Sequence, residues 1–280
     1  MKLYIGVTTY NRKDIVQYNA KSLLQVDKIE NCEIHVFDDC SNEYNMKFLK
    51  KIYKTNKVIC NKENLGADAN AKKMFMDFLG SDCDYLFCAD SDLIYTKNVL
   101  RVIENIIYKL KRANKPVIFS VFSEKHHTTF EEFDPELCKK KFLGCAGTVM
   151  GKDIIKLFIE NVPLRYNEEI EGIDCYYCNI LNSLNYDMFC TKKSYVQHIG
   201  VVGQGADLVD IEWGIDFKID SIVNANAIYY ICENYYKIDE EKIKSIALKL
   251  AKLDKIGVRL SIAMLYYSII SRFKRKKYKK

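Results

Sequence analysis

Short apolar segments alternate with helical segments over the first third of the chain, and this alternation constrains the fold more than any other feature. Strand-like segments and helical patterns cover residues 2–8, 13–24, 33–37, 45–54 and 57–60, followed by a helix that ends near residue 79 and a strand at 84–88. Such alternation builds βαβ units, in which helices cover both faces of a parallel sheet. The sequence therefore predicts an α/β fold with a mostly parallel central sheet flanked by helices.

The length and charge of the chain narrow its class. A chain of 280 residues with 49% hydrophobic content can bury a full core. The formal net charge is +6, but seven of the last nine residues are Lys or Arg, so the body is close to neutral. A nucleic-acid-binding fold would carry basic charge interleaved with stacking aromatic side chains on its body. We therefore expect no nucleic-acid partner.

Eleven cysteines at first suggest a disulfide framework. Their odd number, their position inside apolar segments and the lack of a signal-peptide pattern argue against one. The single Cys-x-x-Cys, Cys175 to Cys178, has no second ligand pair for zinc. We interpret the cysteines as reduced core residues and expect a cytoplasmic location.

Two acids separated by one residue follow the strand at 84–88. Asp90 and Asp92 would project from the same face of an extended segment, as a divalent-cation site requires. A hard cation such as Mn²⁺ or Mg²⁺ prefers carboxylate and phosphate oxygens. A strand that simply ends in a polar loop is the alternative.

Polar clusters also follow the first, second and third strands. They contain Thr9, Tyr10 and Arg12, then Asp38 and Asp39, then Asn64 and Gly66. Each alone is compatible with a turn or a helix cap. Because parallel strands end at one edge of a sheet, where open α/β sheets bind ligands, their recurrence predicts a single site.

These clusters resemble the nucleotide-sugar motifs of family 2 glycosyltransferases of the GT-A fold. The motifs are Thr9-Tyr10-Asn11-Arg12, Asp38-Asp39-Cys40-Ser41, Asn64-Leu65-Gly66, Asp90-Ser91-Asp92, Gly144-Cys145-Ala146-Gly147, Gly172-Ile173-Asp174 and His198-Ile199-Gly200. The resemblance implies a GT-A catalytic domain at 1–205, followed by a helical C-terminal extension with a basic tail at 206–280.

The resemblance also implies a role for each motif residue. Thr9, Tyr10 and Arg12 would surround uridine, and Asp39 would accept a hydrogen bond from uracil. Asp92 would ligate the metal, with Asp90 near the ribose or a metal-bound water. The remaining donor-binding residues would be Asn64, Gly66, Lys72 and Ser91.

Two further residues take their expected roles from the later motifs. Asp174 occupies the place of the catalytic base at the start of a helix, where a carboxylate can also serve as an ordinary N-cap. Glu171 is the reserve candidate. His198 would touch the diphosphate or complete the metal shell, although a lone histidine on a strand is often a plain core residue.

The chain departs from the family pattern at three places. Ala71, Lys72 and Lys73 stand where many members carry an arginine, and a lysine offers a point charge rather than a fork to phosphate. Cys40 replaces the glycine that usually follows the paired acids. Gly172 and Ile173 separate Glu171 from Asp174, which interrupts the usual pair of adjacent acids.

The C-terminal quarter favours a surface role. Helical patterns cover about 219–235, 240–253 and 258–270, and the last is too short to span a bilayer, which needs roughly 20 apolar residues. With the basic tail it is typical of an interfacial anchor on an anionic membrane, at the inner face of the cell membrane. Packing on the domain or on a second subunit, as in a homodimer, is the alternative.

The sequence as a whole predicts a metal-dependent, inverting transfer of one sugar from a UDP-sugar to an acceptor hydroxyl. The Gln-x-x-Arg-Trp sequence of processive synthases is absent, which favours transfer of a single sugar. A surface polysaccharide or lipid-linked glycan acceptor fits the basic tail, and a protein hydroxyl is the alternative. A nucleotidyltransferase and a non-catalytic binding protein also remain open.

Overall fold

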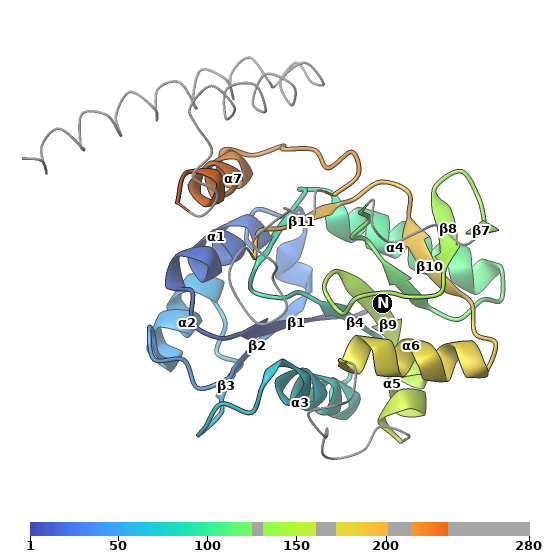
Figure 1. The fold of residues 1–280 in the computed structure, drawn as a ribbon, viewed down its shortest axis with the longest axis horizontal. Coiled ribbons are helices and arrows are strands. Elements are labelled where there is room, and N and C mark those ends of the chain that lie inside the picture. Colours follow the sequence, from blue (N-terminus) through green and yellow to red (C-terminus); the bar gives the residue numbers. More distant parts are fainter. Residues whose placement is uncertain (125–130, 161–171, 201–213, 235–280) are drawn as a thin grey trace, which may run out of the picture. The chain divides into compact units, whose positions relative to one another are not determined.

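The computed structural model describes residues 1–124, 131–160, 172–200 and 214–234 (Figure 1). The chain forms two compact units, residues 1–198 with 212–217 and residues 199–211 with 218–280. The first unit contains the sheet and the strand-end motifs. The predicted domain boundary at residue 205 stays a prediction.

Strands and helices alternate through residue 88, as the sequence predicts, whereas several later strands follow one another directly. Its strands are β1 (Leu3–Thr9), β2 (Glu33–Asp38), β3 (Val58–Cys60), β4 (Tyr85–Cys88), β5 (Leu93–Tyr95), β6 (Ile118–Ser120), β7 (Glu131–Glu132), β8 (Leu137–Lys140), β9 (Thr148–Gly151), β10 (Met188–Thr191) and β11 (Val196–His198). Its helices are α1 (Lys13–Leu23), α2 (Met46–Tyr53), α3 (Ala67–Gly80), α4 (Val99–Arg112), α5 (Lys152–Ile159) and α6 (Ile173–Ser183), with a short 3₁₀ turn, η1, at Ile29–Asn31.

The central sheet has the strand order β3-β2-β1-β4-β9-β6-β10-β8-β7. The first four strands run parallel to one another, and β10 runs parallel to β6. Among these nine strands, only β9 and β8 run against the others, since β9 is antiparallel to β4 and β6, and β8 is antiparallel to β10 and β7. The predicted mostly parallel sheet is confirmed.

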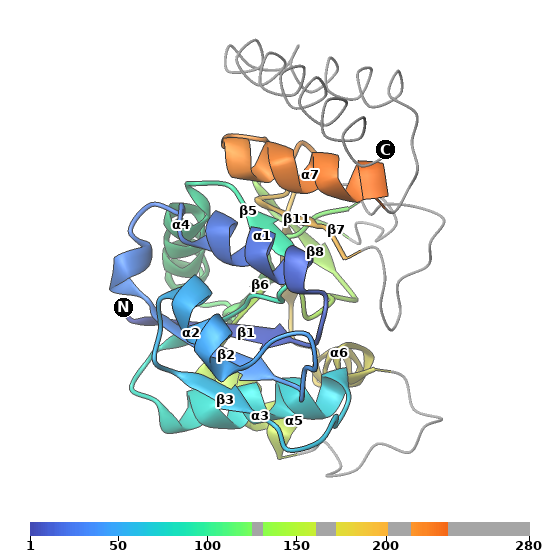
Figure 2. The same ribbon diagram turned by 90° about the vertical axis from the view of Figure 1, so that its left-hand side faces the viewer.

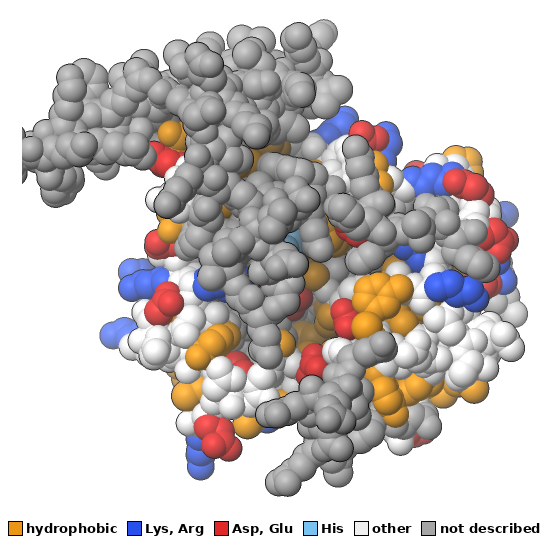
Figure 3. Space-filling model, in the orientation of Figure 1, with side chains coloured by type: hydrophobic (Ala, Val, Ile, Leu, Met, Phe, Trp, Pro, Cys, Tyr) orange, Lys and Arg blue, Asp and Glu red, His pale blue; other side chains and the backbone are white. Residues whose placement is uncertain are grey.

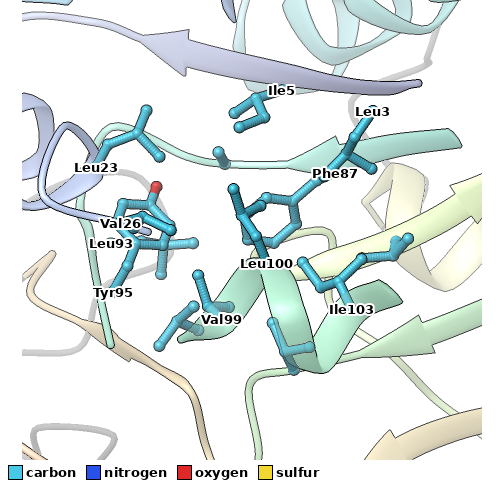
Figure 4. Close-up of a cluster of buried hydrophobic side chains, with 14 of the residues drawn as sticks. Leu3, Ile5, Leu23, Val26, Phe87, Leu93, Tyr95, Val99, Leu100 and Ile103 are labelled. Atoms are coloured by element: carbon cyan, nitrogen blue, oxygen red, sulfur yellow. The ribbon is translucent and has the colours of Figure 1, made fainter. Parts of the chain in front are cut away.

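Helices cover both faces of this sheet (Figures 1 and 2). Because alternate residues of a strand point to opposite faces, Leu3, Ile5 and Val7 of β1 enter one core and Tyr4 enters the other. The first core also contains α1, α2 and α4, and the second contains α3, α5 and α6. Figure 4 shows part of the first core, where Phe87 of β4 lies among Leu3, Leu100 and Ile103.

Several short elements were not predicted, for physical reasons. Strands β7 and β8 carry Glu131, Glu132, Lys139 and Lys140, a charged composition typical of a surface turn. The strand expected at 142–150 is confined to β9, because the chain turns at Gly147 with φ 75°. Helix α5 follows β9 without a spacer, which left no turn signal between them.

The structure tests the predictions about the cysteines fully and those about the C-terminal helices in part. All eleven cysteines lie in described residues, and none of them forms a disulfide in the structure. No helix of the described ranges is long and apolar enough to cross a membrane. In the second unit, the predicted helix at 219–235 is confirmed as α7 (Ile222–Asn234). The expected helices at 240–253 and 258–270 and the basic tail lie outside the described residues.

Candidate active site

Backbone hydrogen bonds bring the ends of the central strands together. The Asp39 N–H donates to the Thr9 carbonyl at 2.9 Å, and the Ser91 N–H donates to the Thr8 carbonyl at 3.0 Å. The polar residues that follow β1, β2 and β4 therefore meet at one edge of the sheet. Figure 3 shows acidic side chains near the middle of one face, with a histidine beside them.

A buried asparagine on α1 holds the turn that carries the paired acids. Asn19 Nδ2 donates to the carbonyls of Asp90 at 2.8 Å and Leu93 at 2.7 Å, and its Oδ1 accepts from the Tyr53 hydroxyl at 2.7 Å. The Thr8 hydroxyl donates to Asp90 Oδ1 at 2.5 Å. These contacts fix the backbone from Asp90 to Leu93 without using the Asp92 side chain.

Asp92 lies between two basic side chains. Arg12 Nη2 is 3.0 Å from Asp92 Oδ2, and His198 Nε2 is 3.4 Å from Asp92 Oδ1. His198 reaches this place because β11 pairs antiparallel with β5, so that His198 lies opposite Leu93. Residues distant in sequence thus converge on one carboxylate, of which only 10% of the side-chain surface is exposed.

The pKa values of Asp90 and Asp92 are shifted in opposite directions. Burial and the neighbouring charge of Asp92 raise the pKa of Asp90 to about 6, against the hydrogen bond from Thr8. Burial alone would raise the pKa of Asp92 as well, but the positive charges of His198 and Arg12 outweigh it and hold that pKa well below its ordinary value. Asp92 is therefore the permanent anion of the pair.

The acids at this edge offer carboxylate oxygens, the ligand type that a hard divalent cation prefers. Asp92 Oδ1 is buried and accepts no hydrogen bond of normal geometry among the described residues, although His198 Nε2 lies 3.4 Å away as an ion-pair partner. Such a carboxylate oxygen keeps the capacity to ligate a cation. His198 Nε2 lies 3.4 Å from this oxygen, but the ligand atoms of Asp90, Asp92 and His198 do not all come within 4.8 Å of one another. The metal roles of these three residues remain predictions, as does the place of Arg12 beside uridine.

Asp39 connects the second strand to the loop before α3. Its Oδ1 accepts from Asn61 Nδ2 at 2.8 Å and from the Leu65 N–H at 2.9 Å, and its Oδ2 accepts from the Gly66 N–H at 2.9 Å. Asn64 Oδ1 also accepts from the Gly66 N–H. Gly66 precedes α3 with φ 87°, a conformation that favours glycine. The structure thus joins Asp39, Asn64 and Gly66, while the uracil contact of Asp39 stays a prediction.

The other predicted donor residues differ in their exposure. The Thr9 hydroxyl is buried, 2.5 Å from the Tyr44 hydroxyl, whereas Tyr10 is 42% exposed. Ser91 is buried. Lys72 lines a groove with Ile59 of β3, and this groove does not include the paired acids.

Asp174 lies in the first turn of α6, after the N-cap residue Gly172. Its Oδ1 accepts from the Cys175 N–H at 2.8 Å, and a side chain at Gly144 would come to 4.0 Å from its Oδ2. The glycine-rich loop therefore leaves space beside this carboxylate. The reserve candidate Glu171 lies outside the described residues.

Several residues at this edge were missed by sequence reasoning. Asn19 was recognisable in principle, as the one amide on the apolar face that Val16, Ala20 and Leu23 share. Asp68, which accepts a hydrogen bond from the Ile173 backbone and lies near Asp174, gave no sequence signal. Cys145 was quoted only as part of the glycine-rich motif. The pKa of its thiol is raised well above its ordinary value by hydrogen bonding with Cys88, by burial and by the charges of Asp90 and Asp174.

This sheet, with acids converging at the carboxyl ends of its parallel strands, has the architecture of the GT-A fold. The chain matches the family described as Glycosyl transferase family 2 over residues 4–150. The chain therefore belongs to Glycosyl transferase family 2. No curated protein matches the chain.

Solved structures agree with the fold. A structure of residues 1–349 of S. aureus TarS in complex with UDP-GlcNAc is 14% identical in sequence, with a TM-score of 0.51, and the match covers 90% of this chain and 80% of that chain. The UDP complex of the same fragment is 13% identical, with a TM-score of 0.52 and coverage of 95% and 87%. These similarities confirm the predicted GT-A fold.

Proposed function

We propose that this glycosyltransferase moves one sugar from a UDP-sugar to an acceptor hydroxyl in a metal-dependent reaction. The observation that carries the proposal is the buried Asp92 carboxylate, which keeps one oxygen without a hydrogen bond at the edge where the strand ends meet. The structures of S. aureus TarS with UDP and with UDP-GlcNAc support a uridine nucleotide as the donor.

Asp92 is the proposed metal ligand, and Asp90 and His198 are the proposed further ligands. When bound there, Mn²⁺ or Mg²⁺ would neutralise the negative charge that develops on the departing diphosphate. Arg12 adds a second positive charge at the same place. Asp39, Asn64 and Gly66 shape the loop proposed to receive the uridine.

Asp174 is the proposed general base. Its Oδ1 accepts a hydrogen bond from the Cys175 N–H, and its Oδ2 lies on the side of Gly144, which carries no side chain. The acceptor hydroxyl gives its proton to this carboxylate as its oxygen attacks the anomeric carbon from the face opposite UDP. The product then has inverted anomeric configuration.

The proposed acceptor is a glycan or lipid-linked glycan of a surface polysaccharide. This choice rests on the basic C-terminal tail, which suits a peripheral location at an anionic membrane surface on the cytoplasmic side. A protein hydroxyl is the other acceptor class. Membrane contact, a homodimer and the division at residue 205 are parts of the proposal that need their own tests.

Product analysis with two matched variants tests the reaction. The wild type should release UDP from a UDP-sugar in the presence of acceptor and Mn²⁺, whereas release of pyrophosphate would indicate nucleotidyl transfer. Asp174→Asn should retain UDP binding and lose transfer by at least about a hundredfold, the scale of general-base catalysis. Asp27→Asn removes an exposed acid outside the site and should leave transfer unchanged. Unimpaired transfer by Asp174→Asn would refute the base assignment.

A further inference from the structure

The Arg12 guanidinium forms an ion pair with Asp92, the carboxylate that is the proposed metal ligand. Arg12 Nη2 lies 3.0 Å from Asp92 Oδ2, while Asp92 Oδ1 faces His198 and lacks a hydrogen bond. The ion pair is largely buried, with 10% of the Asp92 side chain and 27% of the Arg12 side chain exposed. Attraction between such charges is screened much less than that of an ion pair on the surface.

The backbone conformation of residues 11 and 12 sets the position of the Arg12 side chain. Asn11 and Arg12 both adopt left-handed conformations, with φ 51° and 56°, which cost energy for residues with a side chain. The turn is nevertheless held, because the Asn11 N–H donates to Ser41 Oγ at 2.8 Å and the Tyr44 hydroxyl donates to the Asn11 carbonyl at 3.0 Å. The guanidinium is thus aimed at Asp92 by an anchored turn rather than by a free side chain.

A guanidinium and a divalent cation on one carboxylate repel each other. A diphosphate placed beside Asp92 offers Arg12 a new anionic partner, and the planar fork of arginine suits phosphate oxygens. Nucleotide binding would then release Asp92 Oδ2 from the ion pair. Cation binding and nucleotide binding would then strengthen each other through Arg12.

We propose that Arg12 couples cation binding to nucleotide binding. Without nucleotide, Arg12 neutralises Asp92 and weakens its affinity for a divalent cation. With UDP bound, Arg12 contacts the diphosphate and leaves the carboxylate to the cation. This inference rests on the proposed function, and by linkage the cation must strengthen UDP binding by the same factor.

Calorimetric titration of Mn²⁺ with and without saturating UDP tests the coupling. In the wild type, UDP should tighten Mn²⁺ binding at least tenfold. Arg12→Ala should bind Mn²⁺ more tightly than the wild type when UDP is absent, and its coupling factor should fall at least threefold. Arg12→Lys keeps the charge without the fork and should lie between the two.

The matched control is Lys13→Ala, which removes an exposed cation one residue away and should leave the coupling factor unchanged. Thermal melting of each variant verifies that it is folded. An Arg12→Ala protein with weaker Mn²⁺ binding in the absence of UDP, or with an unchanged coupling factor, would overturn the inference. If the wild type bound no UDP, the proposed donor would fail instead, while the Mn²⁺ titrations without UDP would still report the competition.

Discussion

Cys40 shows how a single backbone angle can conflict with a side chain. Its φ of 63° lies in the left-handed region, at the position where the family pattern leads one to expect glycine. The side chain is exposed, and its Sγ lies 3.5 Å from the Lys62 carbonyl oxygen. Strain at such a position costs about 1–2 kcal/mol.

Cys40→Gly should therefore raise the free energy of unfolding by about 1 kcal/mol, after the extra entropy of glycine in the unfolded chain is subtracted. Chemical denaturation under reducing conditions measures this change. Cys40→Ser retains the Cβ and should give no gain. Equal stability of the Gly and Ser variants would show that the left-handed conformation carries no strain here.

Asn19 is the residue on which the geometry of the paired acids depends most. Replacement by leucine leaves the Asp90 and Leu93 carbonyls and the Tyr53 hydroxyl without their buried partner. Each unsatisfied buried group costs about 1–3 kcal/mol, so we expect a loss of about 3 kcal/mol or more in stability and weaker Mn²⁺-dependent UDP binding.

Tyr53→Phe is the control, because it removes one of these hydrogen bonds and leaves the turn at Asp90 intact. It should cost about 1 kcal/mol in denaturation experiments and preserve UDP binding. If both variants bound UDP like the wild type, Asn19 would be a core residue with no part in shaping the site.

Sequence reasoning found the residues that lie in the strand-end motifs and missed those that support them. Asp90 and Asp92 were recognisable as two acids one residue apart after a buried strand. The extended geometry expected for them is wrong, because they lie in a turn in which the Leu93 N–H donates to the Asp90 carbonyl at 3.1 Å. The contact of Arg12 with Asp92 was not foreseen, because it depends on two left-handed residues that have no sequence signal. His198 was expected near the metal, but the β5–β11 pairing that places it was invisible in strands of three residues.

At the scale of elements, an ion-pair network connects the strands far from the site. Asp187, just before β10, contacts Lys115 Nζ at 2.8 Å and Lys139 Nζ of β8 at 3.2 Å. Burial alone would raise the pKa of Asp187, but hydrogen bonds from these lysines outweigh it and lower that pKa. Because the folded pKa is below the unfolded value, the stabilisation is present above about pH 4 and is lost as the pH falls through the folded pKa.

Asp187→Asn should therefore lower stability by about 1 kcal/mol at pH 7 and by progressively less as the pH falls below about 4. Urea denaturation of both proteins between pH 7 and pH 3 measures the difference. A difference that stays constant across this range would contradict the pKa assignment.

At the scale of the whole molecule, the sheet order explains why one edge can act as a donor site. Strands β3, β2, β1 and β4 run parallel and adjacent, so the residues after them meet without further folding. The sequence predicted this arrangement because βαβ alternation is strong in the first ninety residues. It did not predict β8 or the antiparallel direction of β9, since short antiparallel strands carry little local pattern.

The most direct test of the central claim is calorimetric titration of UDP, with GDP as the comparison, into the full chain with and without Mn²⁺. The account predicts binding of UDP in preference to GDP, strengthened by Mn²⁺ and greatly weakened in Asp92→Asn but not in Asp27→Asn. A UDP affinity that is unchanged by Mn²⁺ and by Asp92→Asn would contradict the proposed metal site. Absence of UDP binding in every condition would contradict the proposed donor.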